Sequence, residues 1–456
     1  MKIKQLVRDY PITLTVSVNG ILANFAVAFT SPTFAVFSLL FTGAVLVRGR
    51  HTVTRMILAA GVRLRHHARF HRFFSRARWD MDELWKGLVR LLAQELLSAD
   101  DPVRIGIDDT AQKKTGAKIY GVGMVHDNRP AARKGWNLSW GLTWVVMTVM
   151  IRVPLWPNHV FAIPIGARIY RKKKVCDAED RPFQTKPMLA LDMIRTLASW
   201  LPDRAFLLHV DGGYASGSLM KSLPENVHVL GRLRYDAALY GRPPKRRNRR
   251  GRPRQRGRRL ATPMARVTRR PDDWTPVELP NGKRYEVQSH AALWWKVFGE
   301  RPVLVVASRR PARNPGERPG KPQFFYTTDL TLSAVEVLSG YKDRWTIECL
   351  FHEVKERMGF EEPQCRTERA VERTTPFLLW TAGIVQYWFL SQADADLIGW
   401  RPRWRRNGAT GAPSFSDMLA ATRREILNGG FMQRSTSKDD LVENLRALID
   451  SAAYAA

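Results

Sequence analysis

The sequence predicts an α/β protein in which a mixed sheet is flanked by helices. Short apolar β-like runs begin after residue 101, give way to a helix and then resume, which is typical of strands and helices that share one core. A helical pattern precedes residue 101, and a strongly basic segment separates two sets of strands. The expected strands are 103–108, 119–125, 142–153, 160–165, 206–210, 227–233, 285–290, 303–307 and 324–328.

The N-terminal part contains an uncharged stretch, residues 10–47. Its most apolar section, Thr33 to Val47, is shorter than the roughly 20 apolar residues that a transmembrane helix needs. Pro32 also interrupts the uncharged stretch. We therefore expect a buried helical pair in a protein that has no membrane partner. A membrane segment is the alternative that this composition leaves open.

A basic region follows the uncharged stretch. No acidic residue occurs between Tyr10 and Trp79, and nine arginines lie between Arg48 and Arg78. We interpret residues 52–78 as a helix whose cationic side touches phosphates, with a solvated cationic face of a helical domain as the alternative. Further helices are expected at 81–97, 186–201, 416–427 and 438–452.

The overall charge indicates a polyanionic partner. Lys and Arg number 73 against 42 Asp and Glu, which gives a formal net charge of +31. Such an excess favours nucleic acid or an anionic membrane as the partner. The three cysteines, Cys176, Cys349 and Cys365, are too few and too widely spaced for a disulfide-stapled scaffold. We therefore expect a reducing, cytoplasmic compartment.

The most basic segment is Arg242 to Arg259, which holds 11 Lys and Arg among its 18 residues. Within it, Arg250-Gly251-Arg252-Pro253 has the Arg-Gly-Arg-Pro core of an AT-hook, an arm that lays arginines in a narrow A·T minor groove. We favour an arm that binds phosphates without sequence preference, and minor-groove reading is the alternative. Arg250 and Arg252 are its candidate DNA-binding residues.

Three acidic positions stand out by their context. Asp108, followed by Asp109, stands at the end of an apolar strand; Asp211 ends another strand and runs into a Gly-Gly turn; Glu348 lies in a predicted helix. Carboxylate oxygens are the ligands that Mg²⁺ and Mn²⁺ prefer. Two such ions can activate a nucleophile and stabilise the leaving oxygen in phosphodiester displacement. This set therefore suggests metal-dependent chemistry on a nucleic acid.

The residues around Glu348 form a regular pattern. Tyr341, Arg344, Glu348 and Lys355 have offsets of 0, 3, 7 and 14, which places them on one face of a single helix. The opposite positions are apolar and are expected to pack on the sheet, so that the polar stripe overhangs the strand ends. These apolar positions are Trp345, Leu350, Phe351 and Val354.

At these motifs the sequence resembles the DDE transposases of bacterial insertion sequences. The Tyr341 to Lys355 pattern matches the Tyr-x2-Arg-x3-Glu-x6-Lys (YREK) motif of one group at all four positions. Asp108-Asp109-Thr110 is similar to the family's first motif, Asp-x-Thr/Ser, and Asp211-Gly212-Gly213-Tyr214 is similar to its second, Asp-x-Gly-Tyr. The resemblance runs from about Asp101 to Arg366, and the last motif is the most specific.

The resemblance implies an RNase H-like catalytic core with a β-rich insertion. It implies two Mg²⁺ or Mn²⁺ ions held by Asp108, Asp211 and Glu348, cleavage at transposon ends and strand transfer into target DNA. The doubled Asp108-Asp109 leaves the first ligand ambiguous, and the Asp-x-Thr pattern favours Asp108. Tyr341, Arg344 and Lys355 are then expected to line the DNA.

The resemblance also implies an N-terminal end-binding domain and a homodimer on DNA. We expect a cytoplasmic, nucleoid-associated protein. A DNA-binding protein that has lost catalysis, or an RNase H-like nuclease that does not join strands, are the alternatives. The expected domains are 1–100 (helical, basic, DNA-end-binding), 101–235 (first part of the core), 236–301 (basic loop and β-rich insertion), 302–395 (second part of the core with the catalytic helix) and 396–456 (C-terminal helical region).

Overall fold

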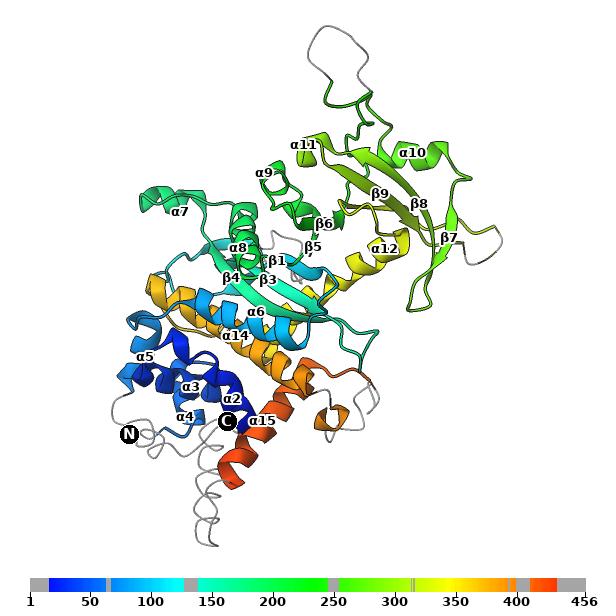
Figure 1. Cartoon of the computed structure of the whole chain (residues 1–456). Helices are drawn as coiled ribbons and strands as arrows, with labels where there is room; N and C mark the ends of the chain where they lie inside the picture. Colours follow the sequence, from blue (N-terminus) through cyan, green and yellow to red (C-terminus); the bar gives the residue numbers. More distant parts are fainter. Residues whose placement is uncertain are drawn as a thin grey trace.

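The computed structural model describes most of the chain (Figure 1). The described residues are 16–62, 67–126, 138–244, 254–312, 314, 316–392, 394–398 and 411–432. Arg250, Arg252 and the helix expected at 438–452 lie outside these ranges.

The described strands form one ten-stranded sheet in the order β2-β3-β1-β5-β6-β10-β9-β8-β7, with β4 paired to β3. Strands β1, β5 and β6 run parallel, while β3 is antiparallel to β1, and β10 is antiparallel to β6. The strands are β1 (Val103–Lys113), β2 (Gly123–His126), β3 (Leu138–Ile151), β4 (Phe161–Tyr170), β5 (Phe206–Val210), β6 (Val227–Arg232), β7 (Thr275–Glu278), β8 (Arg284–Leu293), β9 (Pro302–Arg309) and β10 (Gln323–Thr327).

Helices cover both faces of the central strands. Helices α6, α13 and α14 pack on one face, and α8 lies on the other (Figure 1). The helical elements up to the sheet are α2 (Val16–Ala23), η1 (Ala26–Ala28), α3 (Ser31–Leu46), α4 (Val53–Ala59), α5 (Ala68–Ser75) and α6 (Met81–Glu95). Those that follow are α7 (Lys173–Ala178), α8 (Lys186–Trp200), η2 (Gly212–Tyr214), α9 (Gly217–Met220), α10 (Pro263–Arg269), α11 (Trp295–Phe298), α12 (Ala334–Asp343), α13 (Trp345–Arg357), α14 (Glu368–Ser391), η3 (Ala395–Ile398) and α15 (Phe415–Met432).

This arrangement confirms the predicted mixed α/β class and is consistent with an RNase H-like fold. In the core, an antiparallel unit of β4, β3 and β1 continues into the parallel strands β5 and β6. Parallel strands bury both faces, and β5 is accordingly a fully buried apolar strand. The predicted strands at 206–210 and 227–233 coincide with β5 and β6 to within one residue.

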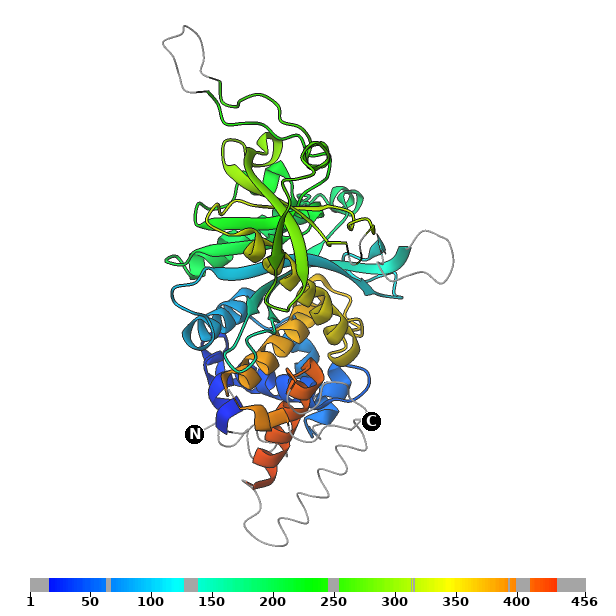
Figure 2. The same ribbon diagram turned by 90° about the vertical axis from the view of Figure 1, so that its right-hand side faces the viewer.

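The N-terminal helices pack around α14, whose middle is buried on all sides. Trp380 of α14 is fully buried, and the rings of Phe25, Phe37 and Phe41 surround it at centroid distances of 4.9, 5.3 and 6.0 Å. The uncharged stretch therefore buries Phe25, Phe37 and Phe41 against α14. Its helices belong to the helical layer below the sheet (Figure 2). Pro32 stands in the first turn of α3, where its missing N–H costs nothing.

No helix in the described part of the chain is long and apolar enough to cross a bilayer. In the uncharged stretch the described helices are α2 and α3, and residues 10–15 lie outside the description.

Two predictions about local structure are wrong. Among the described residues of the helix expected at 52–78 there are two short helices, α4 and α5, because α4 ends at Ala59 and Gly61 adopts φ +71°, a conformation that a helix does not continue through. The strand expected at 119–125 is β2 at Gly123–His126, and the turn before it contains Gly121 at φ +74°.

The strands after the basic segment extend the core sheet. Strand β10 pairs with β6, and β9, β8 and β7 follow in antiparallel order, so that they lie beyond the far edge of the core (Figure 1). The expected boundary at 301/302 falls between β8 and β9, which pair from Glu286 to Leu293. The division into domains stays a prediction.

Candidate catalytic site

The first acidic motif lies in β1, where neighbouring side chains point to opposite faces of the sheet. Asp108 points to the face covered by α13, and Asp109 points to the face covered by α8, as their side-chain partners show. Strand β1 continues to Lys113 because it pairs with β3 up to Gly141. The two carboxylates therefore lie inside the strand rather than at its end.

A guanidinium group connects the first and last acidic positions. Arg344 donates from Nη1 to Oδ2 of Asp108 at 2.7 Å and from Nη2 to Oε1 of Glu348 at 3.0 Å. The Asp108 and Arg344 side chains are 17% and 11% exposed, so this is a largely buried, charge-assisted pair. Strand β1 and helix α13 are thereby joined at the two residues that the sequence marked as catalytic.

The helix predicted through the polar stripe is broken at Arg344. Tyr341 lies in α12, Glu348 lies in α13, and Arg344 is the residue between the two helices. From this position its guanidinium contacts Asp108. The apolar prediction holds for Leu350, Phe351 and Val354, which are buried, and it is wrong for Trp345, which is 62% exposed because it begins α13 at the break.

The junction between α12 and α13 is held over the sheet by ion pairs and one hydrogen bond. Asp343 accepts from Arg152 at 2.6 Å and lies 3.7 Å from Arg104 of β1. His209 of β5 contacts the carbonyl oxygen of Gly340 at 2.9 Å through Nδ1. Because burial, reinforced by the charge of Arg104, lowers the pKa of His209 to about 3, the ring is neutral and donates this bond.

Helix α13 approaches β1 closely at Gly106. A Cβ atom on Gly106 would lie 2.3 Å from Cδ1 of Ile347, a fully buried residue. Gly106 and Asp108 share one face of the strand, and Ile347 immediately precedes Glu348. The missing side chain of Gly106 thus allows the contact that brings Glu348 to Asp108.

Asp211 lies at the end of β5, at the N-terminal cap of the short helix η2. Its Oδ1 accepts from the N–H of Gly213 at 2.8 Å, which fixes the turn. Burial raises the pKa of Asp108 to about 6 despite Arg344, and the negative charges of Asp211 and Asp109 add to this rise. The first two acidic positions are therefore electrostatic neighbours.

A basic cleft of about 730 Å³ opens beside Arg344. Tyr341 and the exposed Trp345 also line it. The described lining residues include no carboxylate, and such a combination of cations and rings suits a nucleic-acid strand. Further cations and rings in its wall are Lys283, Tyr285, Arg309, Arg310, Lys321, Phe325 and Lys342.

The family follows from a comparison with known proteins. A family model described as DDE superfamily endonuclease matches residues 24–293, more than half of the chain. The chain belongs to the DDE superfamily endonucleases. The matched span includes Asp108 and Asp211 and ends before Glu348. Among curated proteins, none matches the chain.

DDE endonucleases use divalent metal ions, and the donor chemistry of this DDE endonuclease fits such ions. Asp108, Asp211 and Glu348 offer hard oxygen atoms. Burial raises the pKa of Asp108, and the nearby negative charges of Asp211 and Asp109 add to this rise, an environment in which a cation would be favourable. Within the described residues, no three His, Cys, Asp or Glu side chains are assembled as a metal site. The positive charge between Asp108 and Glu348 is that of Arg344.

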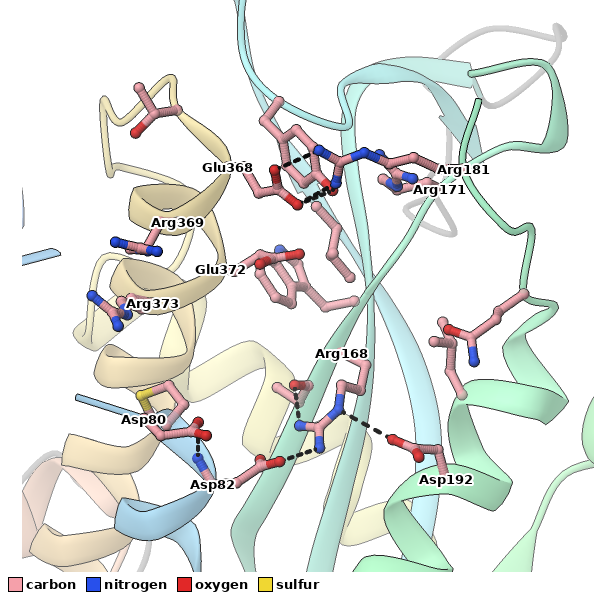
Figure 3. A pocket seen from close by; sticks show the side chains of 18 of the residues that line it. Asp80, Asp82, Arg168, Arg171, Arg181, Asp192, Glu368, Arg369, Glu372 and Arg373 are labelled. Carbon is pink, nitrogen blue, oxygen red and sulfur yellow. Dashed lines mark hydrogen bonds and ion pairs between the residues drawn. The ribbon is translucent and has the colours of Figure 1, made fainter. Parts of the chain in front are cut away.

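A larger cleft of this DDE endonuclease, about 1300 Å³, lies elsewhere, between α6, α14 and the β4 edge (Figure 3). Protein partners pair with several of its cations. Arg168 pairs with Asp82 at 2.8 Å and with Asp192 at 3.6 Å, and Arg181 bonds to Glu368 and Tyr120. These cations of the cleft are therefore engaged in contacts within the protein.

Sequence reasoning missed the cations at the end of β9 and in α12 that line the basic cleft. Arg309, Arg310 and Lys342 are scattered in the sequence, and only the pairing of β8, β9 and β10 beside α12 brings them to Arg344. Lys355, predicted from the motif, is half-buried on α13. The exposed Trp345 could have been found from its place directly after the motif arginine.

Proposed function

We propose that this DDE endonuclease is a transposase, which cleaves DNA at transposon ends and transfers the cut strand into target DNA. The observation that carries the proposal is the link from Asp108 through Arg344 to Glu348. Through these bonds Arg344 and Glu348, which have the spacing of the YREK motif, lie in one site with Asp108 of the first acidic motif. We accordingly assign the chain to the YREK group.

In this proposal Asp108, Asp211 and Glu348 would hold two Mg²⁺ or Mn²⁺ ions. Such ions supply Lewis-acid stabilisation and lower the pKa of a bound nucleophile. Arg344 orients the Asp108 and Glu348 carboxylates and neutralises their charge. Tyr341 and Lys355 contact the DNA backbone beside them, and the cations of the basic cleft hold the strand in place.

The remaining charge is assigned to DNA binding outside the catalytic site. Residues 1–100 form the end-binding domain, whose helix α5 carries the half-buried Arg69 and the exposed Arg72. Residues 236–301 form the β-rich insertion, whose basic segment includes Arg250 and Arg252, and 396–456 form the C-terminal helical region. The core comprises 101–235 and 302–395. The protein acts as a homodimer on DNA in the cytoplasm, associated with the nucleoid.

A catalytically inactive DNA-binding protein is the weaker candidate, because all three carboxylates are present and two share one arginine. A nuclease without strand joining has the same site chemistry, and only its products distinguish it. The test follows from this difference.

The DNA that flanks the gene is first searched for short inverted repeats, and the purified protein is then incubated with Mg²⁺ and a plasmid that carries this flanking DNA. We expect cuts at the repeat ends and products in which these ends are joined to new DNA. Glu348→Gln should bind the same DNA without cutting it. Cuts without joined products would indicate the nuclease, and binding without any cut in the unsubstituted protein would contradict the proposal.

A further inference from the structure

Asp109 lies where three elements meet, on the sheet face opposite to Asp108. Its Oδ2 accepts from Nζ of Lys186 at 2.6 Å, and its Oδ1 accepts from the hydroxyl of Tyr214 at 3.3 Å. Lys186 is the first residue of α8, and Tyr214 is the last residue of η2. Each oxygen of the Asp109 carboxylate thus bonds to a different element of the core.

The bond to Tyr214 reaches the turn that carries Asp211. Asp211 caps η2, and the three residues that follow it form this helix, which ends at Tyr214. The Tyr214 side chain is buried, only 3% exposed, so its ring cannot move without the turn. Asp211 and Tyr214 lie at the two ends of the same short helix. A bond that fixes Tyr214 therefore restricts where the Asp211 carboxylate can lie.

The backbone of Asp109 also contacts the side chain of Asp108. Its N–H donates to Oδ1 of Asp108 at 2.8 Å. Asp109 therefore orients Asp108 through its main chain and holds the Asp211 turn through its side chain. Lys186 holds the Asp109 carboxylate in place, since it is the first residue of a helix that packs on β3 and β4.

We propose that Asp109 is a positioning residue, which sets the distance between the Asp108 and Asp211 carboxylates by tying the Asp211 turn to β1 through Tyr214. This inference rests on the proposed function, because it assigns Asp108 and Asp211 to the metal ions. The carboxylate of Asp109 bonds to Lys186 and Tyr214 on the sheet face opposite to Asp108 and Arg344, which separates its role from that of Asp108.

The test compares two variants, each of which removes the hydrogen bond between Tyr214 and Asp109. Tyr214→Phe deletes the hydroxyl and keeps the buried ring, and Asp109→Ala deletes the acceptor. Loss of groups that orient metal ligands costs about 10- to 100-fold in metal affinity or activity, so each variant should weaken Mn²⁺ binding about 10-fold or more. Mn²⁺ binding is measured by electron paramagnetic resonance on the DNA-free protein, and DNA cleavage is measured beside it.

The matched control is Tyr326→Phe. Tyr326 is also a fully buried tyrosine near Asp211, but its hydroxyl has no hydrogen-bond partner among the described residues. This variant should bind Mn²⁺ and cleave DNA like the unsubstituted protein. The double variant Asp109→Ala/Tyr214→Phe should be no weaker than Asp109→Ala alone, because both changes remove the same link.

Unchanged Mn²⁺ binding in Tyr214→Phe would overturn the positioning role, and so would losses that multiply in the double variant. If Asp109→Ala does not fold, Tyr214→Phe against Tyr326→Phe decides the question. An unsubstituted protein that binds Mn²⁺ but cuts no DNA would remove the transposase proposal, and the Mn²⁺ titrations would still decide the role of Asp109. Absence of Mn²⁺ binding in the unsubstituted protein would overturn both.

Discussion

Asp108 and Asp109 are adjacent in the sequence, yet their carboxylates lie on opposite faces of the sheet. Asp108 bonds to Arg344 beside α13, and Asp109 bonds to Lys186 of α8. Since side chains alternate along a strand, a shift of one residue exchanges these two environments. The two aspartates are therefore not interchangeable, and mutagenesis should separate them.

The first prediction concerns the three proposed metal ligands. Replacing Asp108, Asp211 or Glu348 with Asn or Gln should lower DNA cleavage by about 1000-fold or more, since a lost oxygen ligand weakens stabilisation of the transition-state charge. Binding to terminal-repeat DNA, measured by a mobility shift, should change little. Asp109→Ala should be milder than Asp108→Asn. Cleavage that survives Asp108→Asn but not Asp109→Asn would assign the first ligand to Asp109.

The periodic parts of the fold were predictable from the sequence. The helix at Lys186–Trp200 and the strand at Phe206–Val210 match their predicted ranges closely, because apolar periodicity and clear ends define them. Break points were harder to predict. Tyr341, Arg344 and Glu348 have the sequence spacing of one helical face, yet α12 ends at Asp343 and α13 begins at Trp345.

The candidate site was predictable in its acidic residues but not in its connections. Strand ends and motif spacing singled out Asp108, Asp211 and Glu348. No sequence pattern shows that Arg344 contacts Asp108, because that contact depends on how closely α13 packs against Gly106. The partners of Asp109 likewise become neighbours only when α8 and η2 pack against β1.

The second prediction concerns a buried amide that joins β1 to the loop after α13. Gln112 is fully buried, accepts from Nε1 of Trp144 at 2.8 Å, and donates to Thr375 at 2.9 Å and to the carbonyl oxygen of Phe360. Gln112→Ala leaves these groups without partners and should lower the free energy of unfolding by about 3 kcal/mol. Urea denaturation measures the loss.

The control for Gln112 is Thr375→Val, which removes one of its three bonds and keeps the side-chain volume. It should cost about 1 kcal/mol. Equal losses in the two variants would show that the Trp144 and Phe360 bonds contribute nothing to stability.

The third prediction is a pH dependence of stability at Lys114. Its ammonium group donates to the carbonyl oxygens of Glu361 and Pro363 at 3.0 and 2.8 Å, and burial lowers its pKa from 10.5 to about 8. Between these two values the unfolded chain binds more protons than the folded protein, so stability rises with pH in this window. The unsubstituted protein should therefore gain stability relative to Lys114→Met as the pH rises from 8 to 10.5.

Denaturation of both proteins at several pH values measures this difference, because the other titrating groups contribute equally to the two proteins. A difference that stays constant between pH 8 and 10.5 would show that Lys114 keeps an ordinary pKa in the folded state.

The last prediction concerns the basic arm, Arg242 to Arg259. Its described base is a pair of chain segments, in which Tyr240 pairs with Arg259 and Arg256 stacks over the Tyr240 ring at 4.4 Å. Replacing Arg250 and Arg252 with Ser leaves this base intact. If the arm contacts phosphates, DNA affinity should fall for every sequence, and the slope of log affinity against log salt should flatten by about 0.9 for each lost contact. Lys173→Ser is the control, because this exposed cation pairs with Asp177 at 2.9 Å and should leave the slope unchanged.

A loss confined to A·T-rich DNA would instead favour minor-groove reading, since narrow A·T grooves attract inserted arginines. An unchanged slope on both kinds of DNA would show that these two arginines do not touch it.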